Sequence, residues 1–245
     1  MKILIGISCV PDTTSKIDFV DNNSQFNTTG IQYIINPNDE FGLTKAVNLK
    51  QETQAELTVV TVGEAQVEPI LRKCLAIGAD QAIRIEAAPQ DGFYVAQQLA
   101  ALCQKQQYDL ILVGRESIDY NGGMVGGMLA TLLEVPYVPN CVHLALKGQK
   151  ANLKREIDGG IETLEANLPL VLGTQKGLVE EQDLIIPNMR GIMQARQKPL
   201  EVLPPAEVAT ATRDIVFEKP APKGAVKLVD VDELIRLLEE EAKVI

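Results

Sequence analysis

The sequence predicts an α/β fold, a Rossmann-like parallel sheet with helices on both faces, and two observations carry this prediction. Short apolar runs at residues 3–8, 57–62, 82–85 and 110–113 have the continuous hydrophobicity of strands buried on both faces. Between them lie segments whose apolar residues recur at helical spacing. Alternating strands and helices with short links are typical of parallel strands joined by right-handed crossovers. An antiparallel meander and an extended C-terminal arm are expected farther along the chain.

The composition is that of an ordinary globular protein with a sizeable core. Of the 245 residues, 46% are hydrophobic and 23% are charged. The formal net charge of −10 argues against a nucleic-acid partner, because binding to phosphates needs a basic surface. No apolar run approaches the ~18 residues of a membrane helix. The N-terminus lacks the features of a signal peptide, so we expect no export and a cytoplasmic location.

The cysteines and the single histidine give little support for a catalytic or metal site. Cys9, Cys74, Cys103 and Cys141 show no CxxC spacing and lie in apolar patterns. Buried free thiols in a reducing compartment are therefore expected. His143 lies in a strand-like run, which favours a structural role over catalysis, and no metal site is expected.

Residues 3–35 are predicted to contain the first strand and a hairpin. Gly6 interrupts the apolar run at residues 3–8, which favours either the close approach of a ligand or a simple packing glycine. Residues 16–20 and 31–35 flank a polar segment. We expect these two runs to form a hairpin outside the parallel sheet.

Three helices are expected between the first four parallel strands. The first begins at Pro37 with Asn36 as its N-cap, and the acidic residues that follow complement the helix dipole. Capping alone explains this pattern, but the helix start could also line a ligand cleft near the end of the first strand. The second helix ends at Gly78, and the third occupies residues 94–103.

A polar, glycine-rich loop at residues 114–123 connects the fourth strand to an apolar segment at 124–133, predicted to be a helix buried nearly all round. A loop of this kind before a helix offers backbone N–H groups and a positive dipole end to an anion such as a phosphate. The alternative is a plain strand-to-helix connection with a glycine turn. Neither GxGxxG nor GxxxxGK[ST] occurs here, so the loop is neither a dinucleotide fingerprint nor a P-loop.

Four segments are expected to converge on one cleft. Residues 6–9, 62–63 and 114–125 lie at or just after the carboxyl ends of predicted parallel strands, and residues 36–39 follow the predicted hairpin near the end of the first strand. Ligands bind at this edge of a parallel sheet, where the strand order reverses. Their convergence predicts a binding site more strongly than any one segment does.

The C-terminal half departs from the alternating pattern. Short strands at residues 141–146, 151–155 and 161–165 are joined by glycine-containing turns, so they predict an antiparallel meander. A further apolar strand is expected at residues 168–172. Residues 200–225, rich in Pro and Ala, predict an extended arm that leads to a closing amphipathic helix.

Several short motifs, taken in their order along the chain, carry a resemblance to one protein family. Residues 154–164 are KREIDGGIETL, followed by LPLVL at 168–172. CLAIGAD at 74–80, GRESID at 114–119 and PNMRGIMQAR at 187–196 add to this set, together with Asn-Pro before the first helix and the closing helix. In this combination the chain resembles the beta subunit of electron transfer flavoprotein over its whole length.

The resemblance implies a non-catalytic electron carrier that forms a heterodimer. The alpha subunit would hold the redox-active FAD, and this chain would hold the mobile flavin domain and bury an adenine nucleotide, usually AMP. Electrons would come from acyl-CoA or related flavin dehydrogenases and pass to a membrane-bound quinone oxidoreductase. Residues 1–180 would form the nucleotide-binding domain, residues 181–199 a partner-recognition loop, and residues 200–245 an arm and helix that pack on the alpha subunit.

The resemblance also implies a nucleotide pocket at the predicted cleft. Met124 and Val125 stand where the family usually has Gln and Thr, so polar side chains that would hold a phosphate are missing. Backbone amides and Ser117 or Asn121 would remain for that purpose. The implied pocket comprises Gly6, Asn36, Pro37, Asn38, Asp39, Val62, Gly114, Arg115, Glu116, Ser117, Ile118, Asp119, Tyr120, Asn121, Gly122, Gly123, Met124 and Val125.

Two further roles follow from the resemblance. Glu156 would contact an arginine of the flavin domain; the alternative is a solvated strand charge. Met189 matches a leucine that docks into a hydrophobic pocket on the dehydrogenase, a contact that an adaptable methionine can also make. Arg190 departs from the family pattern, and Ile192 and Met193 complete the recognition segment.

Two alternatives remain open. The first is an electron-bifurcating member of the same family, with a second FAD and use of NADH; the intact REIDGG argues against it, and the altered loop at 120–125 leaves room for it. The second is a stand-alone adenine-nucleotide-binding α/β protein. That protein would need a GxxGxxxxG phosphate loop, which is absent, and would leave the C-terminal arm unexplained.

Overall fold

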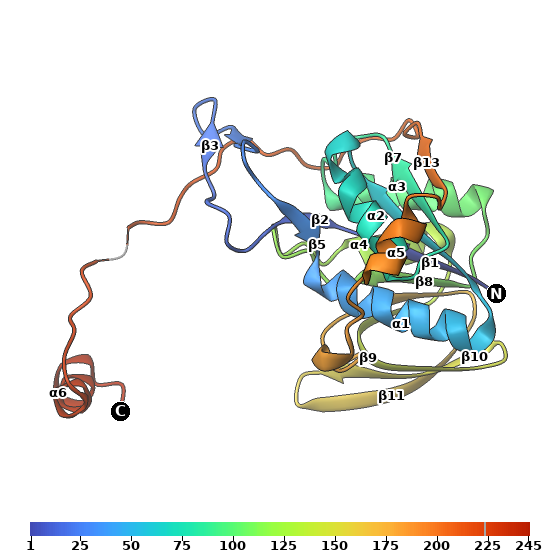
Figure 1. Cartoon of the computed structure of the whole chain (residues 1–245). Coiled ribbons are helices and arrows are strands. Elements are labelled where there is room, and N and C mark those ends of the chain that lie inside the picture. Colours follow the sequence, from blue (N-terminus) through green and yellow to red (C-terminus); the bar gives the residue numbers. More distant parts are fainter. Residues whose placement is uncertain (223) are drawn as a thin grey trace. The chain divides into compact units, whose positions relative to one another are not determined.

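The computed structural model describes residues 1–222 and 224–245, and the chain forms two compact units (Figure 1). The first unit comprises Met1–Asp18 and Asn27–Asp214. The second comprises Phe19–Phe26 and Ile215–Ile245.

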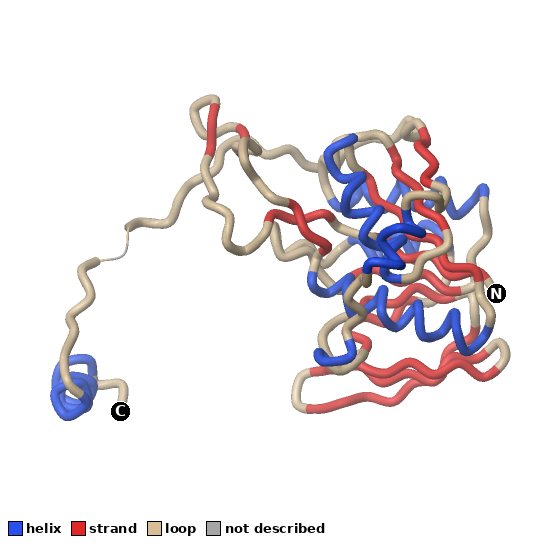
Figure 2. Tube along the Cα trace, in the orientation of Figure 1, coloured by secondary structure: helices blue, strands red, loops and turns tan. Residues whose placement is uncertain are grey.

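Among the described residues of the first unit, nine strands form one mixed sheet in the order β11-β10-β9-β12-β8-β1-β6-β7-β13 (Figures 1 and 2). All neighbouring pairs from β9 to β13 in this order are parallel, and only β9–β10 and β10–β11 are antiparallel. The predicted α/β fold with a parallel sheet and an antiparallel meander is therefore confirmed. The strands are β1 Lys2–Gly6, β6 Glu56–Val62, β7 Gln81–Ile85, β8 Leu110–Gly114, β9 Tyr137–Lys147, β10 Lys150–Ile157, β11 Gly160–Asn167, β12 Leu170–Thr174 and β13 Leu200–Leu203.

The strand order reverses between β1 and β8. From β1 the chain proceeds outward through β6 to β7, and it then returns to the other side of β1 with β8. Parallel α/β sheets bind ligands at such a reversal, outside the carboxyl ends of the strands. The place where Gly6 ends β1 and Gly114 ends β8 is therefore the expected binding position.

Two hydrophobic cores, one on each face of the sheet, hold the first unit together. Ile3 and Ile5 of β1 belong to one core and Leu4 to the other, because successive side chains of a strand point to opposite faces. All three are at most 1% exposed. Burial on both faces explains why the strands are continuous apolar runs. The covering helices are α1 Pro37–Thr53, α2 Glu68–Ile77 and α5 Met189–Ala195 for the first core, and α3 Gly92–Lys105 and α4 Val125–Leu133 for the second.

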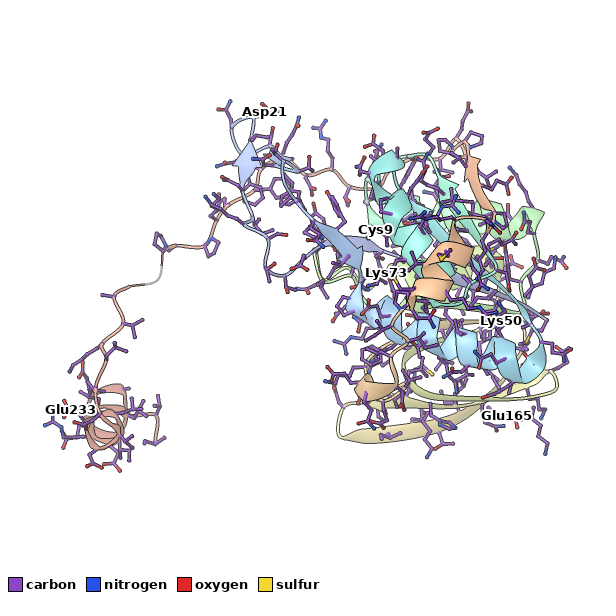
Figure 3. All side chains as sticks on the ribbon, in the orientation of Figure 1. Cys9, Asp21, Lys50, Lys73, Glu165 and Glu233 are labelled. Carbon is purple, nitrogen blue, oxygen red and sulfur yellow. The ribbon has the colours of Figure 1, made fainter. Side chains whose placement is uncertain are left out.

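Two of the helices on the first face, α1 and α2, are also joined by an ion pair. Lys73 of α2 lies 3.1 Å from the carboxylate of Glu40 in the first turn of α1 (Figure 3). At the other end of α1, Lys50 pairs with Asp80 and donates to the carbonyl of Gly78 at 3.0 Å. These contacts tie both ends of α1 to neighbouring elements.

The predicted pairing of residues 16–20 with 31–35 is wrong. The short strand β3, Phe19–Val20, pairs with β4, Gln25–Phe26, in the second unit, whereas β5, Tyr33–Ile35, pairs with β2, Cys9–Pro11, in the first. The reason is local, because Asp21, Asn22 and Asn23 all adopt positive φ and turn the chain back directly after β3. Asp and Asn tolerate this conformation better than other residues with a side chain.

The helix predicted at 124–133 is not buried all round. α4 begins at Val125, and its buried residues are Gly126, Leu129 and Ala130, on the face that meets α3 and the sheet. Leu132 is 37% exposed on the other side. An apolar composition therefore overstated the burial of a helix that has one covered face.

The predicted arm begins with a sheet strand. Leu200–Leu203 form β13, which pairs with β7 at the edge of the sheet, so the extended segment begins after this strand. The closing helix α6, Val231–Leu237, is capped by Asp230, whose side chain accepts from the backbone N–H of Glu233 at 2.9 Å. A single π-helical turn, Leu238–Ala242, follows it. Residue 223 of the predicted arm lies outside the described residues.

Within residues 1–222 and 224–245, no helix combines the length and the hydrophobicity needed to cross a membrane.

Candidate functional site

A narrow crevice lies at the reversal point of the sheet. It has a volume of about 60 Å³. Its floor is made by the ends of β1, β6 and β8, and its sides by α3 and the loop that leads into α4. The lining residues are Gly6, Ile7, Ser8, Val60, Thr61, Val62, Val95, Leu99, Val113, Gly114, Ser117, Gly122 and Val125.

The glycine-rich loop between β8 and α4 folds back on itself beside the crevice. The backbone N–H of Ser117 donates to the carbonyl of Gly122 at 3.3 Å, and these two residues form an isolated antiparallel bridge. Asn121 adopts a φ of 50°, in the left-handed region that Asn enters more readily than most residues. This turn brings Ser117 and Gly122 together on the crevice wall.

Asn36 and Asn38 anchor the loop from the start of α1. The side-chain amide of Asn36 donates to the carbonyl of Glu116 at 2.9 Å and accepts from the backbone N–H of Ile118 at 3.2 Å. The amide of Asn38 donates to the same Glu116 carbonyl at 3.1 Å. Asn36 is fully buried and occupies the N-cap position, but its side chain caps no N–H of α1, so the predicted side-chain capping role is wrong. A buried amide must satisfy its own donor and acceptor, and here the loop provides both partners.

Asp39 lies behind the crevice with its carboxylate buried. Its Oδ2 accepts from the backbone N–H of Ser8 at 2.6 Å, whereas Oδ1 has no hydrogen-bond geometry to any described residue. Burial raises the pKa of Asp39 to about 7, against hydrogen bonds, above all from Ser8, that lower it. A Cβ at Gly114 would lie 2.2 Å from Oδ1, so only glycine fits at this end of β8. Asp39 thus joins the end of β1 to the end of β8.

All predicted pocket residues except Arg115 divide into three groups in the structure. Those that line the crevice are Gly6, Val62, Gly114, Ser117, Gly122 and Val125. Those that support the loop from behind, at the start of α1 or within the loop, are Asn36, Pro37, Asn38, Asp39, Glu116 and Ile118. Those that are exposed on the outer side of the loop are Asp119, Tyr120, Asn121, Gly123 and Met124.

Arg115 fits none of these three groups. Its guanidinium donates to Glu116 at 2.9 Å and to the side-chain oxygen of Gln175 at 3.1 Å, and it does not line the crevice. Met124 is also turned away, since a Cβ at Gly92 would lie 2.7 Å from its Cγ, at the start of α3. Among the residues that the structure describes, none that lines the crevice carries a cationic side chain.

Several lining residues were missed by the sequence prediction. Ser8 lies in the predicted cleft segment 6–9, whereas Thr61 belongs to none of the four predicted cleft segments. Thr61 is the last residue but one of a buried strand at the carboxyl edge of the sheet, so its position alone could have indicated it. Thr61 donates to the carbonyl of Ile7 at 2.7 Å. Val95 and Leu99 reach the crevice only because α3 packs over β1, and spacing within α3 could not have shown this.

The lining of the crevice combines apolar side chains with the hydroxyl groups of Ser8, Thr61 and Ser117. Its apolar side chains suit a flat ring, and the loop supplies backbone N–H groups near the start of α4, which suits an anion. The nearest thiol, Cys9, is unsuited to act as a nucleophile, because burial raises its pKa to about 12. Among the described residues, no group of His, Cys, Asp and Glu side chains could hold a metal ion.

The two other predicted sites lie elsewhere on the first unit. Glu156 is exposed near the end of β10 and accepts from the side-chain amide of Gln175 at 2.5 Å. The predicted recognition residues Met189, Arg190, Ile192 and Met193 all belong to the short helix α5. α5 packs closely on α2, since a Cβ at Gly191 would lie 2.6 Å from the carbonyl oxygen of Ala76.

Comparison with known proteins places these features in context. A family model described as "Electron transfer flavoprotein domain" matches residues 24–208. The chain is 35% identical over 262 residues to "Electron transfer flavoprotein subunit beta" of Bacillus subtilis (strain 168), with all of both chains covered. It is 31% identical over 255 residues to the protein of the same name from Homo sapiens, covering 100% of this chain and 99% of the other. A relative from Oryza sativa subsp. indica, "Electron transfer flavoprotein subunit beta, mitochondrial", is 32% identical over 256 residues.

Proposed function

Since the chain belongs to the electron transfer flavoprotein beta-subunit family, we propose that it forms a heterodimer with an alpha subunit and serves as a non-catalytic part of an electron carrier. The observation that carries this proposal is similarity to named beta subunits over the whole chain. FAD would be held mainly by the alpha subunit and would supply the redox chemistry. This chain would bind an adenine nucleotide, present a docking segment to the electron donor, and hold the flavin domain.

The crevice is the proposed nucleotide site. Its position at the reversal of strand order and its glycine-rich wall support this assignment. Apolar strand ends such as Val62 would contact the adenine, and backbone N–H groups of the loop, with Ser117, would hold the phosphate. Among residues 1–222 and 224–245 no cationic side chain lines the crevice, which favours a monophosphate such as AMP over a more highly charged nucleotide.

Calorimetry on the heterodimer, after removal of its bound nucleotide, tests the site. Gly122 lines the crevice, and the nearest atom to a Cβ there is the Ser117 hydroxyl at 3.6 Å, so a larger side chain enters the crevice without a clash at its first atom. We expect AMP to bind the unmodified protein and Gly122→Leu to weaken binding at least tenfold. Gly160→Leu, where a Cβ meets open space, is the matched control. Absence of AMP binding to the unmodified heterodimer would rule out the site.

Helix α5 is the proposed docking segment for an acyl-CoA or related flavin dehydrogenase. Met189 is 74% exposed, Met193 66% and Ile192 40%, so α5 presents an apolar surface whose methionines can adapt to a partner. Arg190 adds a charge that could set partner choice. The carrier would then pass its electrons to a membrane-bound quinone oxidoreductase.

Two other features support assembly with the alpha subunit. In the second unit, Leu228, Val231, Leu234 and Ile235 are all at least 45% exposed, which fits an arm and helix that are covered by a partner. In the first unit, exposed Glu156 would pair with an arginine of the flavin domain. The four free cysteines agree with the proposed location in a reducing compartment, the cytoplasm.

The three segments expected from the sequence are proposed to have three separate roles. Residues 1–180 would serve nucleotide binding, 181–199 partner recognition and 200–245 assembly, with β13 as a structural exception at the start of the last segment.

A further inference from the structure

Gln175 joins Glu156 to Arg115 through the two ends of one side chain. Its Nε2 donates to Oε2 of Glu156 at 2.5 Å, and its Oε1 accepts from Nη1 of Arg115 at 3.1 Å. Gln175 directly follows β12 and is only 4% exposed, although Glu156 on β10 is exposed. A buried amide therefore reaches out and holds a surface carboxylate.

The chemistry of the three groups leaves one orientation for the amide. A guanidinium can only donate hydrogen bonds, and an ionised carboxylate can only accept them. Oε1 of Gln175 must therefore face Arg115, and Nε2 must face Glu156. Arg115 is itself fixed, because its Nε and Nη2 both donate to the carboxylate of Glu116, at 3.2 and 2.9 Å.

The Glu116 end of this chain of contacts is anchored to the body of the protein. Its backbone carbonyl accepts from the side chains of Asn36 and Asn38. The backbone N–H of Arg115 donates to the carbonyl of Thr174, the residue before Gln175, at 2.8 Å. The network thus runs from the rigid start of α1 to one exposed carboxylate.

We propose that Gln175 is a positioning residue that holds the carboxylate of Glu156 ready for its ionic contact with the flavin domain. This inference rests on the proposed function of Glu156. An exposed ion pair contributes little to binding, partly because a free glutamate loses rotamer entropy when it pairs. A carboxylate that Gln175 already holds has lost that freedom before the partner arrives, and its Oε1 is not used by Gln175.

The proposal assigns Arg115 a role that differs from the one expected from the sequence. Arg115 holds Gln175 and not the nucleotide, in keeping with its absence from the crevice wall. The pair Arg115 and Gln175 thus serves the contact with the flavin domain.

A double-mutant cycle on the FAD-loaded heterodimer tests this role. The variants are Glu156→Gln, Gln175→Met and the double variant, and the measurement is the rate of flavin reduction by a partner dehydrogenase at several salt concentrations. We expect each single variant to slow the reaction two- to fivefold and to remove the same part of its salt dependence. The double variant should be no slower than Glu156→Gln, because both changes remove one contact.

Two controls separate positioning from general damage to the fold. Gln98 is another buried glutamine, 1% exposed, and both ends of its amide bond to the backbone of Ala206 at 2.8 and 2.9 Å. Gln98→Met should leave the rate and its salt dependence unchanged. Gln175→Glu keeps an acceptor for Arg115 but repels Glu156, so it should slow flavin reduction as Gln175→Met does. It serves as the second test variant if Gln175→Met folds poorly.

The outcomes distinguish this inference from the function on which it rests. A normal rate for Glu156→Gln would overturn both the role of Glu156 and that of Gln175. A slow Glu156→Gln with normal Gln175→Met and Gln175→Glu would overturn the positioning role alone. If the slowing in the double variant equals the product of the two single effects, the positioning role is also overturned, because effects that multiply are independent of each other.

Discussion

The buried carboxylate of Asp39 predicts a pH dependence of stability that one substitution should remove. The pKa of Asp39 rises from an ordinary 3.8 to about 7 because the group is buried. A group whose pKa is raised on folding stabilises the folded state fully at pH values below its unfolded pKa. That stabilisation is lost as the pH rises toward 7. Asp39→Asn keeps an oxygen for the Ser8 N–H but cannot ionise. The variant should therefore not lose this stabilisation as the pH rises.

The magnitude follows from the size of the shift. A change from 3.8 to about 7 is roughly three pKa units, and each unit corresponds to about 1.4 kcal/mol. The free energy of unfolding of Asp39→Asn, minus that of the unmodified protein, should therefore rise by about 4 kcal/mol between pH 4 and pH 8. The sign of the change does not depend on how well asparagine fits the site, because that cost is the same at every pH.

Urea unfolding of the heterodimer, followed by circular dichroism at one protein concentration, measures this difference. The contributions of all other titrating groups cancel when the two proteins are compared at each pH. Asp158→Asn, at the exposed turn between β10 and β11, controls for the loss of a carboxylate and should show no such rise. A difference for Asp39→Asn that stays constant within about 1 kcal/mol from pH 4 to pH 8 would show that Asp39 does not have a raised pKa in the folded state.

Three further substitutions have defined expected effects. Gly114→Ala would place its Cβ 2.2 Å from Asp39 Oδ1. Thermal melting should therefore show that the free energy of unfolding falls by about 1–3 kcal/mol. Gly127→Ala, where the nearest atom to the new Cβ lies at 3.6 Å, should leave the free energy of unfolding nearly unchanged. Asn36→Ala removes both amide contacts to the loop, so hydrogen exchange of the Ile118 N–H should become faster; unchanged protection would contradict the anchoring role. Met189→Ala on α5 should raise the KM for the dehydrogenase severalfold without lowering kcat. Val202→Ala on β13 is the control and should leave this KM unchanged. Equal effects of the two substitutions would exclude α5 as the docking segment.

The sheet could be predicted because burial on both faces leaves a continuous apolar run in each strand. The hairpin could not, because β3 and β4 have only two residues each and no alternation to detect. Their pairing depends on three consecutive residues with positive φ. β13 was missed for a related reason: an edge strand of four residues, with Glu201 and Val202 exposed, has no buried run.

The candidate site was predictable in position but not in the roles of its residues. The glycines and the end of each parallel strand indicate the crevice, since chain direction alone brings them to one edge. Asn36 shows the limit of this reasoning, because a residue at an N-cap position suggests capping, while tertiary packing instead directs its side chain to the loop. The role of Gln175 could not be predicted from the sequence, because its two hydrogen-bond partners, Arg115 and Glu156, lie 60 and 19 positions away along the chain.

If this chain is a carrier subunit whose crevice holds a single AMP, the nucleotide content of the heterodimer must reflect it. The most direct measurement is to purify the chain with its co-expressed alpha subunit, denature the complex and separate the released nucleotides by chromatography. We expect one FAD and one AMP for each heterodimer. FAD alone would contradict the assignment of the crevice, and two FAD molecules would contradict the carrier assignment in favour of the bifurcating type.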